Sequence, residues 1–388
     1  MIKEDESKYV MHTYNRFNIA LDHGEGCYIY DEDNKKYLDM GSGIAVSSLG
    51  YNHPVLSKAL EAQLHKLLHT SNLYYTKPQV EAARLLIKYS DFDKVFFCNS
   101  GAEANEAAIK IARKYGSSKS KDKVEIITLE GGFHGRTYGS LTATAQEKYQ
   151  APFKPLVPGF SYAKFNDLES MKELISEKTC AVIVEVIQGE SGIHVADSHY
   201  LQEVEKLCKQ YDVLLIIDEV QTGMGRTGSL FAYSQFGIQP DIVTTAKGLG
   251  AGLPIGAVLA KENANILLPG DHGTTFGGNL LATTAAKVVL TTLCEEGILT
   301  QIQEISEYLK SQLEELKLSE ELIVDVRGKG LMLGVELSVA AKPVIDKCVE
   351  KGLLLIGAGE KVIRFLPPLI LEKAHVDEAI EIFQEGLK

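Results

Sequence analysis

The sequence has no paired cysteines, no long apolar run and no excess of positive charge, and each absence excludes a class of protein. Its six cysteines are scattered, with no CxxC pair and no nearby histidine at metal-ligand spacing. A disulfide framework and a structural zinc site are therefore not indicated. We expect reduced thiols in a cytoplasmic protein that uses no metal.

Membrane and nucleic-acid partners are disfavoured as well. No segment approaches the ~20 apolar residues of a membrane span, and the N-terminal MIKEDESKYVM lacks the apolar core of a signal peptide. Lys and Arg number 40 against 52 Asp and Glu, giving a net charge of −12, which argues against a phosphate-backbone partner. At 388 residues and 45% hydrophobic, the chain is long enough for one large and one smaller domain.

The stretch from residue 212 to 252 carries the strongest signal. Residues 213–217 and 242–246 are short, β-branched apolar runs bounded by turn residues, as in buried parallel strands. The first run leads to Asp218 and the second to Lys247, and the 29 positions between these residues are typical of one strand–helix–strand crossover. Both side chains should then lie at the carboxyl edge of one sheet, where open α/β folds bind ligands.

Lys247 is followed at once by Gly248, Gly250 and Gly252. Desolvation would lower the pKa of its ammonium group toward neutrality and make it a nucleophile for a carbonyl. A Schiff-base lysine with an acidic partner for the pyridinium nitrogen, here Asp218, is the pair that pyridoxal phosphate needs. For Lys247 alone, a strand-end lysine that reaches solvent is the alternative.

A phosphate site is predicted where residues 95–98, a further strand, run into an Ala-rich helix. Ser100 can cap this helix, while Gly101 and Ala102 leave its first amide groups uncovered. Such a helix start binds anions, although an ordinary helix cap is an equal alternative.

Residues 124–129 form the next predicted strand and lead into GGFHGRT. The glycines allow close approach of the backbone, Phe133 offers a face to a flat ring, and Arg136 offers a cation to a carboxylate. We favour a functional loop over a solvated one because a solvated loop does not require Phe133.

Residues 181–187 are another buried strand, and it carries Glu185 and leads into Gln188-Gly-Glu190. Buried carboxylates need partners. Arg364, which interrupts a distant apolar segment, is one candidate, and a purely structural salt bridge is the alternative.

Two motifs that suggest other functions are set aside. Residues 223–228 fit GxGxxG, with Asp241 18 positions beyond, so a dinucleotide-binding oxidoreductase is formally possible. However, five residues separate the strand from the first glycine, and Asp241 precedes the next strand. His65 and His69 lie four apart on a predicted helix, but no third zinc ligand is evident.

The remaining chain divides into three predicted regions. Residues 1–50 form an arm and hairpin packed on the small domain, 51–284 the large domain, and 285–388 a small α+β domain. Strands are expected at 27–30, 36–40, 256–260, within 324–337, and at 353–356 and 362–366. One helix is expected to begin at Pro54, and others to span 281–293, 298–318, 342–351 and the C-terminus. Residues 151–165 are expected to form an irregular surface excursion.

Taken together, the motifs resemble those of class III aminotransferases, which are fold-type I pyridoxal phosphate enzymes. FCNSGAEANE, GGFHGRT, EVIQGE, IIDEVQTGMGRTG, TTAKGLGAGLPIG and TTFGGN stand in the family's order across nearly the whole chain. The resemblance implies an α/β fold, with a mostly parallel sheet in a large domain beside a smaller α+β domain, and a homodimer.

The resemblance also implies roles for individual residues. Lys247 would bond the cofactor and move the proton, Asp218 would keep the ring nitrogen protonated, and Phe133 would stack on the ring. The implied cofactor contacts are Gly101, Ala102, Phe133, Asp218, Glu219, Val220, Gln221, Lys247 and Thr275, with Thr275 reaching the neighbouring subunit's phosphate. The implied substrate contacts are Arg136 for the donor's α-carboxylate, Thr274, and the pair Glu190 and Arg364.

Within the family, TYNRFNIAL, GSGIAVSSLGYNHP and HTSNLYYTKPQ are most similar to the members that use N-acetylornithine and 2-oxoglutarate in arginine biosynthesis. Ornithine, succinyl-diaminopimelate and 4-aminobutyrate remain alternative donors, and an aminomutase or decarboxylase with the same cofactor is a further alternative. The chain departs from the family pattern at Val186, Ser191 and Leu280, which affects loop stiffness near the substrate and not the reacting groups.

Overall fold

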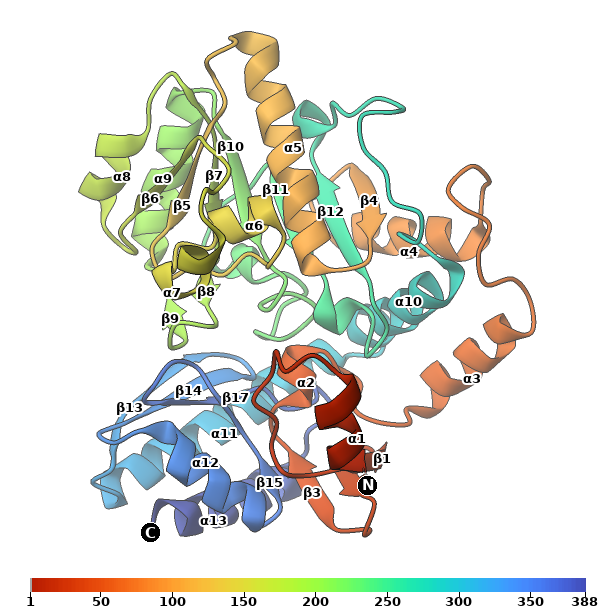
Figure 1. Cartoon of the computed structure of the whole chain (residues 1–388), viewed down its shortest axis with the longest axis vertical. Coiled ribbons are helices and arrows are strands. Elements are labelled where there is room, and N and C mark those ends of the chain that lie inside the picture. Colours follow the sequence, from red (N-terminus) through yellow and green to blue (C-terminus); the bar gives the residue numbers. More distant parts are fainter. Residues whose placement is uncertain (1) are drawn as a thin grey trace.

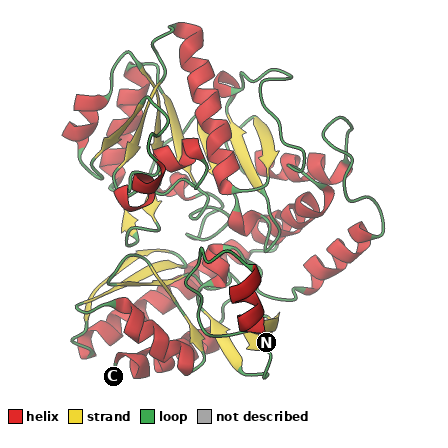
Figure 2. Cartoon of the chain, in the orientation of Figure 1, coloured by secondary structure: helices red, strands yellow, loops and turns green. Residues whose placement is uncertain are grey.

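The computed structural model describes residues 2–388 and has two parts, which Figure 1 shows one above the other. The upper part is built on a seven-stranded sheet, and the lower part combines the C-terminal elements with the N-terminal arm. Figure 2 shows helices on the outside of both parts. Within residues 2–388, no helix has the length and apolar character to cross a membrane.

The bounds of the elements are as follows. The α-helices are α1 (Ile2–Tyr9), α2 (Ser42–Ala45), α3 (Pro54–Leu64), α4 (Lys77–Lys88), α5 (Gly101–Lys119), α6 (Tyr138–Ala143), α7 (Glu147–Gln150), α8 (Leu168–Leu174), α9 (Ser198–Gln210), α10 (Leu280–Glu295), α11 (Ile298–Ser319), α12 (Ala341–Glu350) and α13 (Lys373–Leu387). The 3₁₀ turns are η1 (Ala151–Phe153), η2 (Ala232–Gln235), η3 (Lys247–Leu249) and η4 (Glu262–Ala264). The strands are β1 (Leu21–Glu25), β2 (Tyr28–Asp31), β3 (Lys36–Asp39), β4 (Lys94–Cys98), β5 (Glu125–Leu129), β6 (Phe160–Ala163), β7 (Thr179–Val184), β8 (Ile187–Gln188), β9 (His194–Val195), β10 (Leu214–Asp218), β11 (Ile242–Thr245), β12 (Gly256–Ala260), β13 (Ile323–Lys329), β14 (Met332–Leu337), β15 (Leu353–Leu354), β16 (Ile356–Gly357) and β17 (Val362–Phe365).

The central sheet has the strand order β4-β12-β11-β10-β7-β5-β6, and only β12 runs antiparallel to its neighbours. The mostly parallel α/β fold expected from the sequence is confirmed. Alternate residues of its strands face opposite layers, as the two-residue period of a strand requires. Leu214 and Ile216 pack with the alanine-rich face of α5, whereas Leu215 and Ile217 belong to the core that includes α9. Buried on both faces, these strands read as continuous apolar runs.

Two expectations about connections are wrong. The segment between β10 and β11 has no α-helix and consists of turns with the single 3₁₀ turn η2, because its glycines and left-handed residues interrupt helical pairing. Residues 151–165 are not wholly an irregular excursion, since residues 160–163 form β6, the edge strand that pairs with β5. The three prolines, which suggested a loop, all precede this short strand.

The N-terminal hairpin belongs to the lower part of the molecule. Strands β1, β2 and β3 form a sheet whose last member is β15, with Leu38 opposite Leu353. A second sheet has the order β13-β14-β17-β16 and carries α11, α12 and α13. The domain limits at residues 50 and 284 stay predictions, and α10 runs through the second limit while it packs on α3 and α4.

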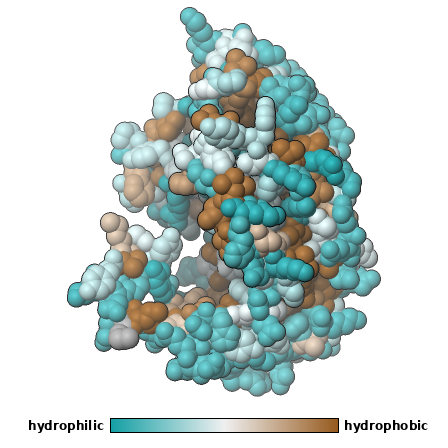
Figure 3. Space-filling view, turned by 90° about the vertical axis from the view of Figure 1, so that its right-hand side faces the viewer, coloured by the Kyte–Doolittle hydropathy of each residue, from teal (hydrophilic) through white to brown (hydrophobic). Residues whose placement is uncertain are grey.

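One side of the molecule exposes large apolar side chains. Figure 3 looks onto the side that carries α3, α4 and α10 in Figure 1, and apolar groups lie among the polar surface there. Exposed residues from this region include Leu64, Leu73, Tyr75 and Phe276, with Leu73 85% exposed. Clustered exposed apolar side chains of this kind are typical of protein interfaces.

Candidate active site

A cavity of about 400 Å³ lies where four parallel strands of the central sheet end. Four segments at these strand ends contribute to the cavity wall. They are residues 99–102 after β4, 133–136 after β5, 218–221 at the end of β10, and 246–247 after β11. The predicted juxtaposition of Asp218 and Lys247 at one sheet edge is therefore present. The carboxyl edge of an α/β sheet is also where backbone polar groups and loop side chains converge on ligands.

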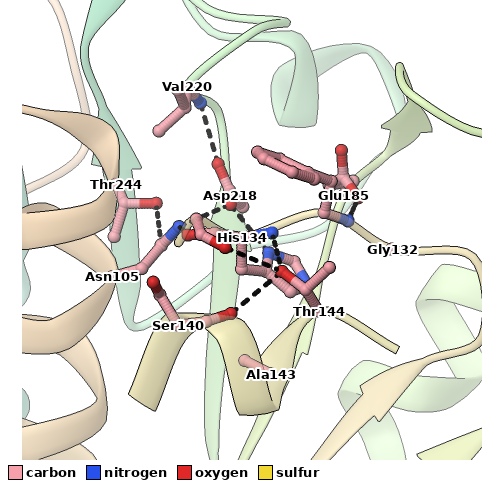
Figure 4. Close-up of polar contacts among 12 residues, drawn as sticks. Asn105, Gly132, His134, Ser140, Ala143, Thr144, Glu185, Asp218, Val220 and Thr244 are labelled. Carbon is pink, nitrogen blue, oxygen red and sulfur yellow. Dashed lines mark hydrogen bonds and ion pairs between the residues drawn. The ribbon is translucent and has the colours of Figure 1, made fainter. Parts of the chain in front are cut away.

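Asp218 is held by three donors (Figure 4). Its Oδ2 accepts a hydrogen bond from Asn105 Nδ2 at 2.7 Å and lies 2.7 Å from His134 Nδ1, while Oδ1 accepts from the amide of Val220 at 3.0 Å. Asn105 is fixed in turn, because its Oδ1 accepts a hydrogen bond from Thr244 at 2.8 Å. Three donors to one buried carboxyl fix its orientation.

His134 is fully buried, and its protonation is governed by its acidic neighbours. Burial alone would lower the pKa of His134, but the hydrogen bond and charge of Asp218, with the charge of Glu185, raise that pKa above its ordinary value. The backbone of His134 is held as well, since its amide donates to Thr144 Oγ1 at 2.8 Å (Figure 4). His134 can therefore act as a donor to Asp218 at neutral pH.

Glu185 lines the same cavity and is bound by a backbone amide. Its Oε2 accepts a hydrogen bond from the Phe133 amide at 2.8 Å, and not from Arg364. Burial raises the pKa of Glu185 to about 7. The carboxyl thus orients the loop that carries Phe133.

Lys247 follows β11 and begins the turn η3. Its backbone is in the left-handed region, with φ of 43°, which a residue other than glycine adopts only where the surroundings impose it. One such constraint is the next residue, since the Gly248 carbonyl accepts a hydrogen bond from Ser48 Oγ at 2.9 Å. Burial lowers the pKa of Lys247 to about 8, and the charge of Glu190 opposes this shift. Much of this amine is therefore neutral and nucleophilic near pH 8.

The start of α5 forms an anion site on the cavity wall. Ser100 Oγ accepts a hydrogen bond from the Glu103 amide at 3.2 Å and caps the helix. Within residues 2–388 the structure gives no acceptor for the amides of Gly101 and Ala102, both of which line the cavity. Two free amides at a helix N-terminus attract a phosphate.

These groups fit pyridoxal phosphate. The site offers an amine of lowered pKa, an oriented carboxylate, an aromatic side chain and a helix start with free amides around one cavity. The resident residues that would hold it are Lys247, Asp218, Phe133, Gly101 and Ala102. Val220 and Gln221 also line the cavity, as does Arg136.

An ion pair lies beside this cavity and contacts Gln221, which lines it. Arg364, on β17 of the lower part, is 2% exposed, and its Nη1 donates to Glu190 Oε1 at 2.7 Å, to the Gly189 carbonyl at 2.9 Å and to Gln221 Oε1 at 3.0 Å. Burial would raise the pKa of Glu190, but the charge of Arg364 and its hydrogen bond lower that pKa below its usual value. Of the two carboxylates considered for Arg364, Glu190 is the partner.

Five predicted residues do not line this cavity: Glu190 and Arg364, which form the ion pair beside it, and three others. Glu219 points into the core, where its carboxylate accepts hydrogen bonds from Thr222 Oγ1 at 2.6 Å and from the Tyr233 amide at 2.7 Å. Thr274 lies on a neighbouring loop and accepts a hydrogen bond from Asn99 Nδ2 at 2.9 Å. Thr275 is exposed on the same loop, so its role toward a second subunit stays a prediction.

The GxGxxG motif lies where the two parts of the molecule contact each other. Arg226 within it is buried, and its Nη1 donates to the carbonyls of Leu331, at 3.1 Å, and Pro367. Asp241 instead accepts from the amide of Leu215 at 2.9 Å and so connects two strands. Neither arrangement offers a dinucleotide a binding surface.

Asn105 and His134 were given no role from the sequence. Asn105 carried a signal, because it stands on the buried face of α5 among Ala104, Ala107 and Ala108, where an amide side chain needs a partner. His134 stood in a motif already singled out, but its contact with Asp218 spans 84 residues of sequence and depends on the tertiary fold.

Comparison with known proteins agrees with this geometry. The family description "Aminotransferase class-III" matches residues 9–387. The acetylornithine aminotransferase of Aquifex aeolicus is 50% identical over 98% of this chain and 100% of its own. The solved N-acetylornithine aminotransferase of Stenotrophomonas maltophilia is 37% identical, with a TM-score of 0.86 over 99% of this chain and 97% of its own. A Toxoplasma gondii ornithine aminotransferase, solved with partial occupancy of PLP, is 31% identical, with a TM-score of 0.95 over 100% and 93%.

Proposed function

The chain belongs to the class III aminotransferases, and on that premise we propose that it transfers the terminal amino group of N-acetylornithine to 2-oxoglutarate. The products are N-acetylglutamate 5-semialdehyde and glutamate, in arginine biosynthesis, and pyridoxal 5′-phosphate is the cofactor. Relatives with 45–50% identity over nearly the whole chain that carry the name acetylornithine aminotransferase support the choice of donor.

The residues around the cavity have separate tasks. The cofactor, when bound, supplies an aldehyde and a ring that accepts electrons. Asp218, oriented by its three donors, would hold the proton on the ring nitrogen. Lys247, with its pKa lowered to about 8, can give up and take back a proton at the substrate carbon. The free amides of Gly101 and Ala102 would bind the phosphate, and Phe133 would cover the ring.

One observation carries the proposal for a terminal-amine donor: Arg364 is already paired with Glu190, whereas no acid among residues 2–388 pairs with Arg136. An uncovered Arg364 would attract the α-carboxylate and place the α-amine at the reacting position. Because Arg364 is bound to Glu190 at 2.7 Å, the cation available to the donor's α-carboxylate is Arg136. The donor is then held with its far end toward Lys247. Glutamate must displace Glu190 to present its α-amine.

The proposal includes a homodimer in the cytoplasm. Exposed apolar residues on the face of α3, α4 and α10 and the outward position of Thr275 support a second copy there, with Thr275 binding the phosphate of the neighbouring subunit. Thr274, beside it on the same loop, would lie near the substrate.

The test is a donor panel on purified holoenzyme with 2-oxoglutarate as acceptor. We expect kcat/KM for N-acetylornithine to exceed that for ornithine, succinyl-diaminopimelate and 4-aminobutyrate by orders of magnitude, because a site that accommodates or rejects an α-substituent separates such donors strongly. A higher kcat/KM for ornithine or 4-aminobutyrate would reject the donor assignment and leave the aminotransferase chemistry intact. Turnover without 2-oxoglutarate would instead indicate an aminomutase or decarboxylase.

A further inference from the structure

The guanidinium group of Arg136 is held by aromatic rings. Its Cζ lies 4.1 Å from the ring centroid of Tyr149 and 5.5 Å from that of Phe133. Within residues 2–388, the structure records no hydrogen bond or ion pair from this guanidinium to a carboxylate or carbonyl. A cation within about 6 Å of a ring centroid is attracted by the ring's quadrupole. The face of the guanidinium is thus covered, and its N–H edge is free.

Tyr149 stands on a segment that is fixed to the loop carrying Arg136. It lies in the four-residue helix α7, between Gln146 and Gln150. Gln146 Nε2 donates to the carbonyls of Gly131 and Gly132, each at 3.1 Å, and Gln150 donates to the carbonyl of Thr144 at 2.8 Å. Gln146 therefore fastens α7 to the start of the GGFHGRT loop, and Gln150 fastens it to the end of α6, which follows that loop.

The ring of Tyr149 also contacts Phe133. The two rings are 5.9 Å apart at an interplanar angle of 82°, an edge-to-face pair. One side chain thus touches both the aromatic group that would cover the cofactor ring and the cation that faces the substrate. Lys148 Nζ lies 4.7 Å from the same ring, but its side chain is exposed and does not line the cavity.

We propose that Tyr149 is a positioning residue that holds Arg136 ready for the donor's carboxylate. The inference rests on the proposed function, in which Arg136 binds that group. Guanidinium binds a carboxylate through two parallel N–H bonds in its own plane and can stack on an aromatic face at the same time. A guanidinium that is already stacked loses less side-chain freedom when the carboxylate arrives, so the complex is tighter.

The test is the dissociation constant of N-acetylnorvaline, measured by calorimetry on holoenzyme. This compound keeps the carboxylate and acetamide of N-acetylornithine and lacks the amine, so it cannot react. Tyr149→Ala and Tyr149→Leu should weaken its binding about 2- to 30-fold, the range of a cation–π contact. Tyr149→Phe keeps the ring and should remain within about 2-fold of wild type.

A double-mutant cycle separates positioning from a general structural effect. In an Arg136→Ala background, Tyr149→Leu should cause no further loss of binding, because the cation it positions is gone. Phe153→Ala removes another aromatic ring from the same segment, and it should leave binding unchanged. Wild-type binding by Tyr149→Leu, or an equal loss with and without Arg136, would overturn the inference.

Failure of the proposed function gives a different result. It would be seen in the wild-type donor panel, as preference for another donor. The same cycle would then use the analogue of that donor that keeps the carboxylate and lacks the reacting amine. Wild-type affinity in Arg136→Ala alone would overturn both the role of Arg136 and that of Tyr149.

Discussion

Replacing Glu190 by alanine should change which amine the enzyme accepts. Arg364 would lose its charged partner and keep only neutral acceptors, the Gly189 carbonyl at 2.9 Å, Gln221 Oε1 at 3.0 Å and the Gly357 carbonyl at 3.4 Å. The guanidinium would then be available to the α-carboxylate of any donor. Reaction at α-amines should rise relative to reaction at terminal amines.

The magnitude follows from the ion pair. Unit charges about 4 Å apart attract by about 4 kcal/mol at an effective dielectric of 20, and the desolvation of both groups reduces this figure. The masking effect therefore lies between about 1.4 kcal/mol, which is tenfold, and about 4 kcal/mol, nearly a thousandfold. Because Arg364 holds the pKa of Glu190 below its usual value, the pair is ionised at neutral pH and the full effect should be present there.

The assay is the ratio of kcat/KM for glutamate to kcat/KM for N-acetylornithine, each measured in the half-reaction. Glu190→Ala should raise this ratio at least tenfold. Glu190→Gln keeps the shape without the charge and should follow alanine. Glu203→Ala removes a half-buried acid of α9, paired with Lys206 at 2.6 Å, and serves as the control. An unchanged ratio in both Glu190 variants would show that the ion pair does not select the reacting end.

Three further predictions concern the buried groups. His134→Leu removes a donor to Asp218 and should lower the free energy of unfolding by about 1–3 kcal/mol in urea titrations. Because Asp218 raises the pKa of His134, this loss should be fully present below the ordinary pKa of 6.5 and should shrink as pH rises through the raised pKa. A loss that does not change with pH would contradict the charged pair. In apo-protein, acylation of Lys247, followed by peptide mapping, should reach half its maximal rate near pH 8, because burial lowers the pKa of Lys247; a midpoint near the ordinary 10.5 would reject a desolvated amine. Gly116→Ala should destabilise the protein by about 1–3 kcal/mol despite alanine's higher helix propensity, because the new Cβ would lie 1.9 Å from the Lys123 carbonyl oxygen; a thermal midpoint at or above that of wild type would refute the clash.

The sheet was predictable from sequence because its strands are buried on both faces. Short apolar runs with turn residues at each end identified β4, β5, β7, β10, β11 and β12. The edge strand β6 was missed, since its sequence FSYA is partly exposed and follows a proline-rich segment. A helix was wrongly predicted between β10 and β11, because chain length alone cannot distinguish a helix from a long run of turns.

Part of the site was predictable for the same reason. Asp218 and Lys247 interrupt or end apolar runs, where a charged side chain is conspicuous. The partners of Asp218 were not, because Asn105 and His134 reach it only when α5 and the loop after β5 pack against β10. Glu219 follows Asp218 in the motif, but successive residues point in opposite directions, so its carboxylate enters the core and does not line the cavity.

This division between sheet and loops explains why the reaction is easier to predict than the donor. Asp218 and Lys247 are fixed by adjacent, hydrogen-bonded strands, with Asp218 opposite Thr244 in the ladder, so few substitutions can separate them. Arg136 lies on a loop, and Arg364 comes from β17 of the other part of the molecule. Arg136 is held by the rings of Tyr149 and Phe133, and Arg364 by the carboxylate of Glu190 and a few neutral acceptors. Changes in such contacts can alter which donor binds while the reacting groups stay in place, which is why relatives with one fold differ in substrate.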